Sequence, residues 1–342
     1  MRARLAACAA ALLASSFFWA CSGGDGVDLD GSPGDDGGAT SDGSPATDGS
    51  LGSDADAASV DAAKDSGPVA PPGPVYGAKC TGADANESTA TDEIAIVRGK
   101  AQLPAMNCVD TIMQAARNHS NYIGDNGWTL THTESSGSPG FTGVNFWDRM
   151  AAAGYSGSPE FEVVHSVSDA HAAITGQNGW INTLYHRIPF VAYSTKDFGF
   201  GAASGNGGAT STTDFGSGSS APSKTSMTTW PANGDTGIWT TFHNSYEIPN
   251  PLPNQQVAGY PITIIGGSTL TLATHDITAN SAAVAHIVIT SSSDSTGLIP
   301  QSQIYLIPNN VLSKNTTYTV HVTGTVNGSP YDLTFSFTSG ST

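Results

Sequence analysis

Basic residues are scarce in this sequence. Its 342 residues include 12 Lys and Arg against 29 Asp and Glu, which gives a formal net charge of −17. Many of the acidic residues lie in residues 22–75, and residues 76–342 still hold more acidic than basic residues. A nucleic-acid-binding protein needs a basic surface that neutralises phosphates. The composition therefore argues against nucleic acid as a partner.

Short catalytic and nucleotide-binding motifs are also missing. The sequence contains no Gly-x-Ser-x-Gly elbow, Walker A loop, His-Glu-x-x-His pair or EF-hand loop. The stretch "GFGAAS", residues 199–204, has only part of a nucleotide-binding glycine pattern, because Ser204 stands where the third glycine belongs. We interpret residues 197–202 as a core strand. A functional site must therefore be assembled by the fold from residues that are distant in the sequence.

Long apolar runs are limited to the N-terminus. Residues 5–20 follow the basic Arg2 and Arg4 and are too short to span a bilayer. We interpret residues 1–21 as a signal peptide for export to the cell envelope or surface, or for secretion. Its end, "FFWAC", resembles the lipobox of bacterial lipoproteins, which predicts acylation of Cys21 and a membrane anchor. The alternative, "LAAC" near the N-terminus, leaves no apolar run before the cleavage point.

The next segment lacks the apolar residues that a core requires. Residues 22–75 consist almost entirely of Gly, Ser, Ala, Asp, Thr and Pro. Such a segment cannot bury enough apolar surface to offset chain entropy, so we expect a disordered acidic tether. Only two cysteines remain beyond it, Cys80 and Cys108. In an exported protein they predict a disulfide, and they lack the spacing of a structural zinc site.

The rest of the sequence divides into two regions. Residues 76–220 alternate between helical and strand patterns, which predicts an α/β domain. Residues 226–342 contain short β-branched runs separated by turn residues such as Asn327-Gly328, which predicts an all-β sandwich. In the first region we expect helices over 91–103, 107–123, 145–155 and 169–187, the last interrupted near 176–179, and strands over 161–167, 190–204 and 211–217.

The stretch "GWINTLYHRIPF", residues 179–190, combines an apolar helical pattern with two adjacent cationic residues. Its apolar residues recur at helical spacing from Trp180, and His186-Arg187 follow. Proline does not continue a helix, so we expect the helix to end at Pro189. Two interpretations of the pair remain open. It either stabilises the negative end of the helix or places His186 against a cleft.

Five short motifs occur in a fixed order along residues 90–216. They are "AARNH" (115–119), "THT" (131–133), "RMAAAGY" (149–155), "FEV" (161–163) and "WINTLYHR" (180–187). This series resembles the bacterial branch of the CAP superfamily, whose SCP domain occurs in cysteine-rich secretory proteins, antigen 5 and pathogenesis-related 1 proteins. The resemblance implies that residues 76–220 form a three-layer α-β-α sandwich.

The resemblance also implies a cleft. In the family it is formed by two His and one or two Glu, which map onto His132, His186 and Glu162. The neighbours of Glu162 differ from the Gly and Asn of the family motif, and Glu160 is a rival for its place. In several members such a cleft holds a divalent metal. Two imidazoles and a carboxylate would suit Zn²⁺ with an open position, which makes His132 and His186 the candidate metal ligands.

The other histidines have no assigned role. His119 is expected to pack within its helix, and His165 and His171 match no family motif. The C-terminal region resembles bacterial Ig-like domains, with Tyr318 as the packing anchor of a strand corner. Its histidines are dispersed and suggest no site: His243, His275, His286 and His321.

Together, these observations predict an exported envelope protein whose CAP cleft binds a small ligand, a lipid or a divalent metal. One alternative is a metal-dependent hydrolase in which Glu162 is the general base toward a metal-bound water. Another is a surface adhesion or structural module that acts through the Ig-like domain. The sequence leaves open whether the protein is an enzyme, because one fold supports many functions.

Overall fold

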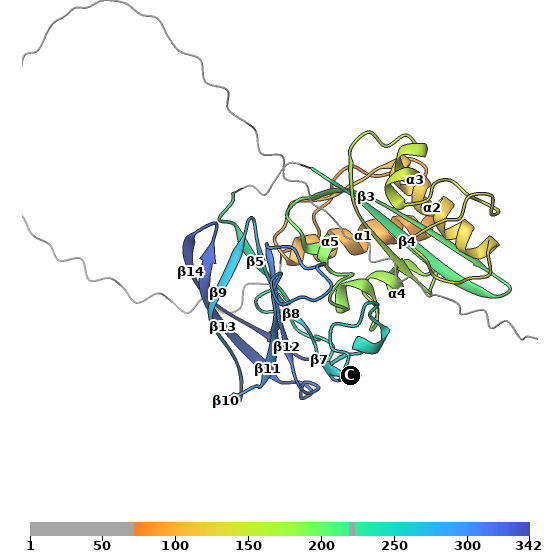
Figure 1. Ribbon diagram of the computed structural model, residues 1–342. Helices are drawn as coiled ribbons and strands as arrows, with labels where there is room; N and C mark the ends of the chain where they lie inside the picture. The colour runs from red at the N-terminus through yellow and green to blue at the C-terminus, as the bar shows by residue number, and fades with distance from the viewer. Residues whose placement is uncertain (1–71, 219–222) are drawn as a thin grey trace, which may run out of the picture. The chain divides into compact units, whose positions relative to one another are not determined.

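The computed structural model describes residues 72–218 and 223–342 (Figure 1). The predicted signal peptide, Cys21 and residues 22–71 of the predicted tether lie outside the described residues. The described residues belong to one compact unit, Gly67–Thr342. No helix in them combines the length and apolar character that a membrane span requires.

The first region contains three of the expected helices. α1 (Ala85–Lys100) begins with a capping box, in which Asp84 and Glu87 each accept a hydrogen bond from the other's backbone N–H. α2 (Asp110–Asp125) matches the expected amphipathic helix. α3 (Phe146–Ala152) is followed by Gly154, whose φ of +92° favours glycine and ends the helix.

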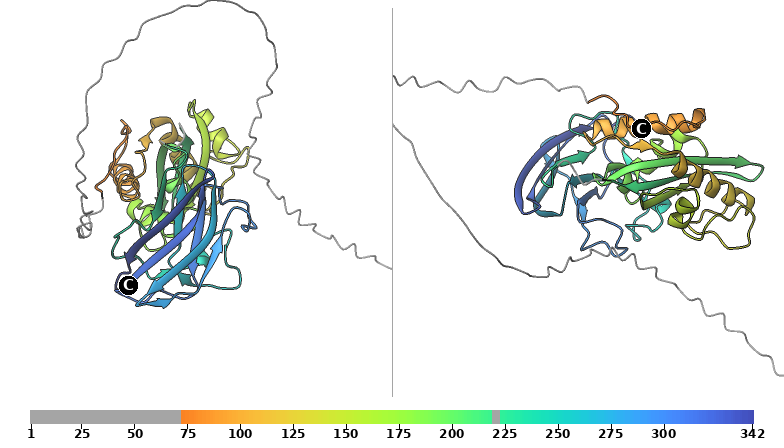
Figure 2. Two further views of the ribbon diagram at one scale, coloured as in Figure 1. Left: turned by 90° about the vertical axis from the view of Figure 1, so that its left-hand side faces the viewer. Right: turned by 90° about the horizontal axis from the view of Figure 1, so that it is seen from above.

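A four-stranded sheet accompanies these helices. Its strand order is β1-β3-β4-β2, with β1 parallel to β3 and the other neighbours antiparallel. In the view from above in Figure 2, α1 and α2 lie on opposite sides of β3 and β4. Residues 197–202 lie in β3, which confirms the prediction of a strand. The bounds are β1 (Asn107–Cys108), β2 (Ser158–His165), β3 (Thr195–Gly205) and β4 (Gly208–Ser217).

The glycines of β3 allow α2 to approach the sheet closely. A Cβ at Gly199 would lie 2.0 Å from the backbone nitrogen of Met113, and one at Gly201 would lie 2.2 Å from that of Arg117. Side chains alternate between the two faces of a strand, and Phe200 between these glycines is buried in the main apolar core. The Gly-Phe-Gly pattern therefore serves helix-to-sheet packing.

Residues 169–191 depart from the expected helix. They form α4 (Ala170–Ile174), the 3₁₀ helix η1 (Trp180–Asn182) and α5 (Ile188–Val191). Pro189 lies in the first turn of α5, where its missing N–H costs no hydrogen bond. The prediction that a helix ends at Pro189 is therefore wrong, because this proline starts a helix instead.

Hydrogen bonding to a distant acceptor explains this departure. The backbone N–H groups of Leu184, Tyr185 and His186 donate to the carboxylate of Glu247 rather than to carbonyls of a preceding helical turn. Apolar spacing predicts which side chains can share a helix face, but it does not reveal a competing acceptor that lies elsewhere in the chain.

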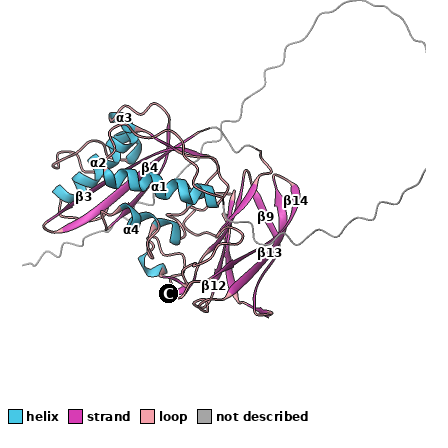
Figure 3. Ribbon diagram, turned by 180° about the vertical axis from the view of Figure 1, so that it is seen from behind, coloured by secondary structure: helices cyan, strands magenta, loops and turns pink. Residues whose placement is uncertain are grey.

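Antiparallel strands dominate the C-terminal region (Figure 3). One sheet has the order β10-β9-β13-β14, a second has the order β11-β12-β8-β5, and β6 pairs with β7. Asn327 and Gly328 both have positive φ and turn the chain between β13 and β14, as the sequence predicts. The bounds are β5 (Met227–Trp230), β6 (Thr241–Phe242), η2 (Asn244–Tyr246), β7 (Ala258–Gly259), β8 (Ile262–Gly266), β9 (Leu270–Ala279), β10 (Ala282–Ala283), β11 (His286–Ile289), β12 (Gln303–Pro308), β13 (Thr317–Val326) and β14 (Ser329–Thr338).

Buried polar contacts join the two regions. The guanidinium of Arg187 is fully buried and donates to the carbonyls of Ile181 and Pro261 and to the hydroxyl of Thr263. Its central carbon also lies 4.9 Å from the centroid of the Tyr260 ring. A buried charge that lacks such partners costs several kcal/mol. The C-terminal region is therefore a structural part of the same folded unit.

The disulfide Cys80–Cys108 is formed, as the sequence predicts, and closes a loop with a sequence separation of 28. Replacement of both cysteines by serine removes this constraint from the unfolded chain. We expect the free energy of unfolding to fall by about 3–4 kcal/mol. Urea denaturation of the oxidised wild type and the double variant measures the difference. The reduced wild type is the control, and a midpoint equal to that of the oxidised protein would contradict the prediction.

Candidate functional site

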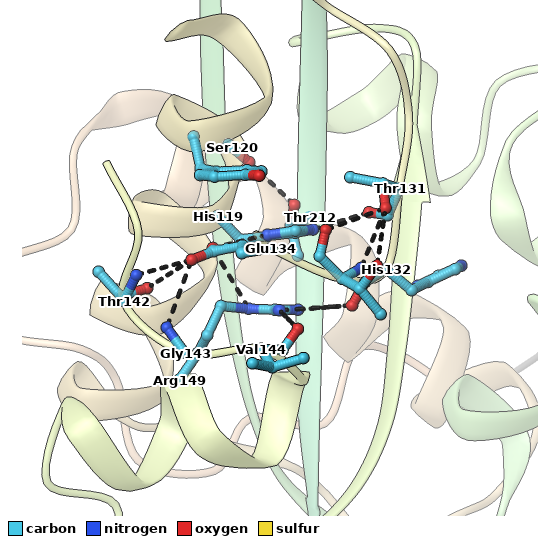
Figure 4. A network of polar contacts seen from close by, with 12 residues as sticks. His119, Ser120, Thr131, His132, Glu134, Thr142, Gly143, Val144, Arg149 and Thr212 are labelled. Carbon is cyan, nitrogen blue, oxygen red and sulfur yellow. Dashed lines mark hydrogen bonds and ion pairs between the residues drawn. The ribbon is translucent and has the colours of Figure 1, made fainter. Parts of the chain in front are cut away.

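Glu162 on β2 is the centre of a buried charge cluster. Figure 4 shows other members of this cluster, His132, Glu134 and Arg149. Its Oε1 lies 2.9 Å from Nδ1 of His132, and its Oε2 accepts a hydrogen bond from Arg149 of α3. The side chains of Glu162 and Arg149 are almost completely buried. Burial acts to raise the pKa of Glu162, but the nearby His119, the His132 hydrogen bond and the Arg149 charge together lower it to about 2. Glu162 is therefore ionised at neutral pH.

A second buried carboxylate, Glu134, completes the cluster. Its Oε1 lies 2.9 Å from Nδ1 of His119, and its Oε2 accepts a hydrogen bond from the backbone N–H of Thr142. Burial acts to raise the pKa of Glu134, but these hydrogen bonds and the Arg149 charge lower it. Nε2 of His119 faces the carbonyl of Thr131 at 2.8 Å. Each imidazole nitrogen of His119 thus lies against an oxygen acceptor, one a carboxylate and the other a carbonyl.

His186 is held by a carboxylate from the C-terminal region. Its Nδ1 lies 2.6 Å from Oε1 of Glu247, which also accepts hydrogen bonds from the backbone N–H groups of Tyr185 and His186. Oε2 of Glu247 accepts from the backbone N–H of Leu184. Burial acts to raise the pKa of Glu247, but the His186 charge and these hydrogen bonds lower it. The ionised carboxylate thus fixes both the backbone and the imidazole of His186.

His132 and His186 line one cavity of about 640 Å³. Residues of both regions form its wall, including Trp180 and Thr183 from the first region and Phe242 and Tyr246 from the second. Glu162 lies behind His132 and is not among the lining residues. Among the described residues, those that line the cavity include no Asp, Glu, Lys or Arg. The cavity wall therefore combines imidazoles with apolar and uncharged polar side chains.

The predicted zinc site does not fit this geometry. Both oxygens of Glu162 are engaged, one by His132 and the other by Arg149. Residues 72–218 and 223–342 contain no group of three or more His, Cys, Asp or Glu side chains that could hold a metal ion. Catalytic zinc sites use three protein ligands and an open position. His132 and His186 alone fall short of that number.

The other candidate residues are dispersed. Glu160, the rival of Glu162, lies 2.9 Å from the hydroxyl of Ser194 and is not part of the cavity wall. His171 is exposed and pairs with Glu93. His119 is buried in α2, as a packing residue would be, but it also forms part of the charge cluster.

Three residues with a role at the cavity were not identified from the sequence. His165 and His243 line it, and Glu247 orients His186. His165 lies three residues after Glu162 on β2 and therefore on the opposite face of the strand, so its spacing did not connect it to Glu162. Glu247 and His243 lie in a segment without recognisable pattern, and no local signal connects them to His186.

The acid dependence of stability tests the charge cluster. The pKa of Glu162 in the folded protein is lowered from 4.5 to about 2, so its stabilising effect is present above 4.5 and is lost as the pH falls toward about 2. Asp214, opposite Glu162 on β4, has a raised pKa because of burial and the Glu162 charge, and it remains neutral in this window. We expect Glu162→Gln to lower the free energy of unfolding near neutral pH by about 3 kcal/mol. The difference from the wild type should shrink across the window.

Chemical denaturation over this pH range measures the difference. Glu93→Gln is the control, because Glu93 pairs with the exposed His171 and its loss should cost less than about 1 kcal/mol. A Glu162→Gln difference that stays constant with pH would contradict the predicted ionisation of Glu162.

A family model matches part of the sequence. Residues 91–215 match the model of the cysteine-rich secretory protein family, CAP. An outer surface protein of Borrelia burgdorferi is a similar solved structure, with 22% sequence identity, a TM-score of 0.30, and coverage of 37% of this chain and 88% of that one. No curated protein matches the chain. Residues 91–215 are therefore a CAP domain of the cysteine-rich secretory protein family.

Proposed function

We propose that this protein is an exported CAP domain protein that binds a small ligand or lipid in the cavity lined by His132 and His186. The observation that supports the proposal most directly is the cavity itself. Its volume of about 640 Å³ lies in the usual range of small-molecule sites, and apolar walls with a few polar groups are typical of such sites. The imidazoles are held rigidly by buried carboxylates, which favours recognition with little loss of side-chain entropy.

The proposal includes a three-layer α-β-α sandwich for the CAP domain. Close packing of α2 on the glycines of β3, together with the buried core that contains Phe200, supports it. It also includes an Ig-like sandwich for the C-terminal region. Two four-stranded antiparallel sheets support this, as does Tyr318, which is buried, stacks on Phe337 and accepts a hydrogen bond from the backbone N–H of Ser313.

Binding is favoured over hydrolysis by the state of the carboxylates. Glu162 and Glu247 are ionised, but their oxygens are already bonded to protein donors. A general base must reach the proton that it removes, directly or through one water. Neither carboxylate meets this condition in the cavity. The adhesion alternative is less well supported, because the C-terminal region forms part of the cavity wall.

Export is supported by the signal-peptide pattern of residues 1–21 and by the Cys80–Cys108 disulfide, which is typical of oxidising compartments. We further propose that Cys21 is acylated. The full chain, expressed in a bacterium with labelled palmitate, should incorporate the label, and Cys21→Ser should abolish incorporation. Cys8→Ser is the matched control and should leave the label unchanged. Labelling that survives Cys21→Ser would exclude Cys21 as the acylation site.

A bulky side chain in the wall tests the cavity. Ser166 is an exposed lining residue, and Ser166→Trp would place an indole in the space that a ligand needs. We expect this variant to weaken binding of the neutral apolar fluorophore N-phenyl-1-naphthylamine by roughly tenfold or more, which corresponds to about 1.4 kcal/mol. A fluorescence titration measures the affinity, and thermal unfolding verifies that the fold is intact.

Ser292→Trp is the control, because Ser292 is exposed in the C-terminal region and does not line the cavity. It should bind the fluorophore as the wild type does. Equal affinities of the wild type and Ser166→Trp would show that the fluorophore binds elsewhere, and absence of binding to the wild type would contradict the proposed function.

A further inference from the structure

The fold brings together two histidines of the C-terminal region whose positions in the sequence suggest no site. His275 lies on β9 of one sheet and His286 on β11 of the other. Nδ1 of His275 and Nε2 of His286 lie 2.8 Å apart, and the two ring centroids are 5.0 Å apart. Neither residue lines the cavity of the candidate functional site. The two imidazoles therefore form a separate pair that joins the two sheets.

Strand geometry directs both side chains toward the space between the sheets. His275 is directly opposite Val322 of β13, and residues in this position share one face of a sheet. His286 and Val288 lie two residues apart on β11 and also share a face. Val322 is buried in the main apolar core, and Val288 packs against that core. The backbone thus holds both imidazoles on inward faces, while His275 remains exposed to solvent and His286 is half-buried.

The contact between the rings requires an unprotonated nitrogen. Two N–H groups cannot face one another at 2.8 Å, so at most one proton lies between Nδ1 of His275 and Nε2 of His286. Nδ1 of His286 lies 2.8 Å from the carbonyl of Val284, which can only accept, so this nitrogen donates. The contact therefore holds one proton and one lone pair, and a metal ion can take the place of the proton.

The orientation of His286 is that of a metal ligand. A histidine that binds a metal through one ring nitrogen almost always donates the N–H of the other to a carboxylate, a backbone carbonyl or water. The carbonyl of Val284 supplies this partner for His286. The exposed His275 can donate its Nε2–H to water.

The distance between the two nitrogens favours one class of metal. Two nitrogens that each lie about 2.0 Å from a metal ion are about 2.8 Å apart when they subtend a right angle, and about 3.3 Å apart in a tetrahedron. The observed 2.8 Å matches the right angle. Square-planar or tetragonal sites with nitrogen and oxygen ligands are typical of Cu²⁺ and Ni²⁺, and Cu²⁺ binds more tightly than Ni²⁺ or Zn²⁺. Residues 72–218 and 223–342 supply no third side-chain ligand to such a site, so water oxygens complete the coordination.

The charge of the C-terminal region also suits a cation. Residues 226–342 contain five Asp and Glu residues, one Lys and no Arg. β9 and β11, which carry the pair, contain Asp276 but no Lys or Arg. The approach of a divalent cation therefore meets no cationic side chain on the strands that would bind it.

From these observations we infer that His275 and His286 form a binding site for a tetragonal divalent metal ion, Cu²⁺ in preference to Ni²⁺ or Zn²⁺. The ion replaces the proton between the two rings and bridges the two sheets of the C-terminal region. This site is independent of the proposed function, since its residues lie outside the cavity.

Copper binding by the purified protein tests the site. Calorimetric titration with CuCl₂, in a buffer that does not coordinate copper, should show one tight equivalent. His275→Gln and His286→Gln should each weaken this binding roughly tenfold or more, because each removes one of the two imidazoles. His321→Gln is the matched control, because His321 also lies in the C-terminal region but pairs with Asp332. It should bind copper as the wild type does.

Pulsed electron paramagnetic resonance counts the imidazoles on the bound Cu²⁺. We expect two in the wild type and one in either variant of the pair. A single imidazole in the wild type, or unchanged affinity in both variants, would show that copper binds elsewhere and would overturn the inference. So would absence of copper binding, or an equal loss of affinity in His321→Gln. Tighter binding of Zn²⁺ than of Cu²⁺ would overturn the assignment of the metal. Thermal unfolding verifies the fold of the variants, and the wild-type imidazole count decides the question even if a variant does not fold.

Discussion

A buried carboxylate is stable only where hydrogen bonds and opposite charges replace the water that it has lost, and this requirement organises the cavity. Glu162 meets it with His132 and Arg149, and Glu247 meets it with three backbone N–H groups and His186. In both cases Nδ1 of the imidazole makes the contact with the carboxylate. The orientation of the two rings is therefore a consequence of charge burial and precedes any contact with a ligand.

The same requirement links the cavity to the C-terminal region. Residues 184–186 leave the helical pattern because their N–H groups donate to Glu247. The next residue, Arg187, is fully buried and donates to Pro261 and Thr263 of the C-terminal region. Removal of residues 226–342 would leave Nη1 of this guanidinium and the N–H groups without these partners. The CAP domain of this chain is thus stabilised by contacts that lie outside residues 91–215.

The sequence predicted the parts of the structure that local patterns determine. Apolar spacing and glycine placement predict helices α1, α2 and α3, the strand at residues 197–202 and the Asn327-Gly328 turn. Motif order identified His132 and Glu162, which the structure brings into contact, and His186 of the same cavity. The role of Glu247 could not be predicted, because it lies 61 residues from His186 and acts through a pairing that only the folded chain creates.

The position of the charges decides what the cavity can recognise. The ionised pair of Glu162 with Arg149 and the contact of Glu134 with His119 lie in the protein interior. The wall itself presents no ionised Asp, Glu, Lys or Arg side chain among the described residues. Recognition then depends on apolar contacts and on the imidazoles of the wall. Such a wall is selective against charged molecules, because a charge that loses its water there without gaining an oppositely charged partner is costly to bury.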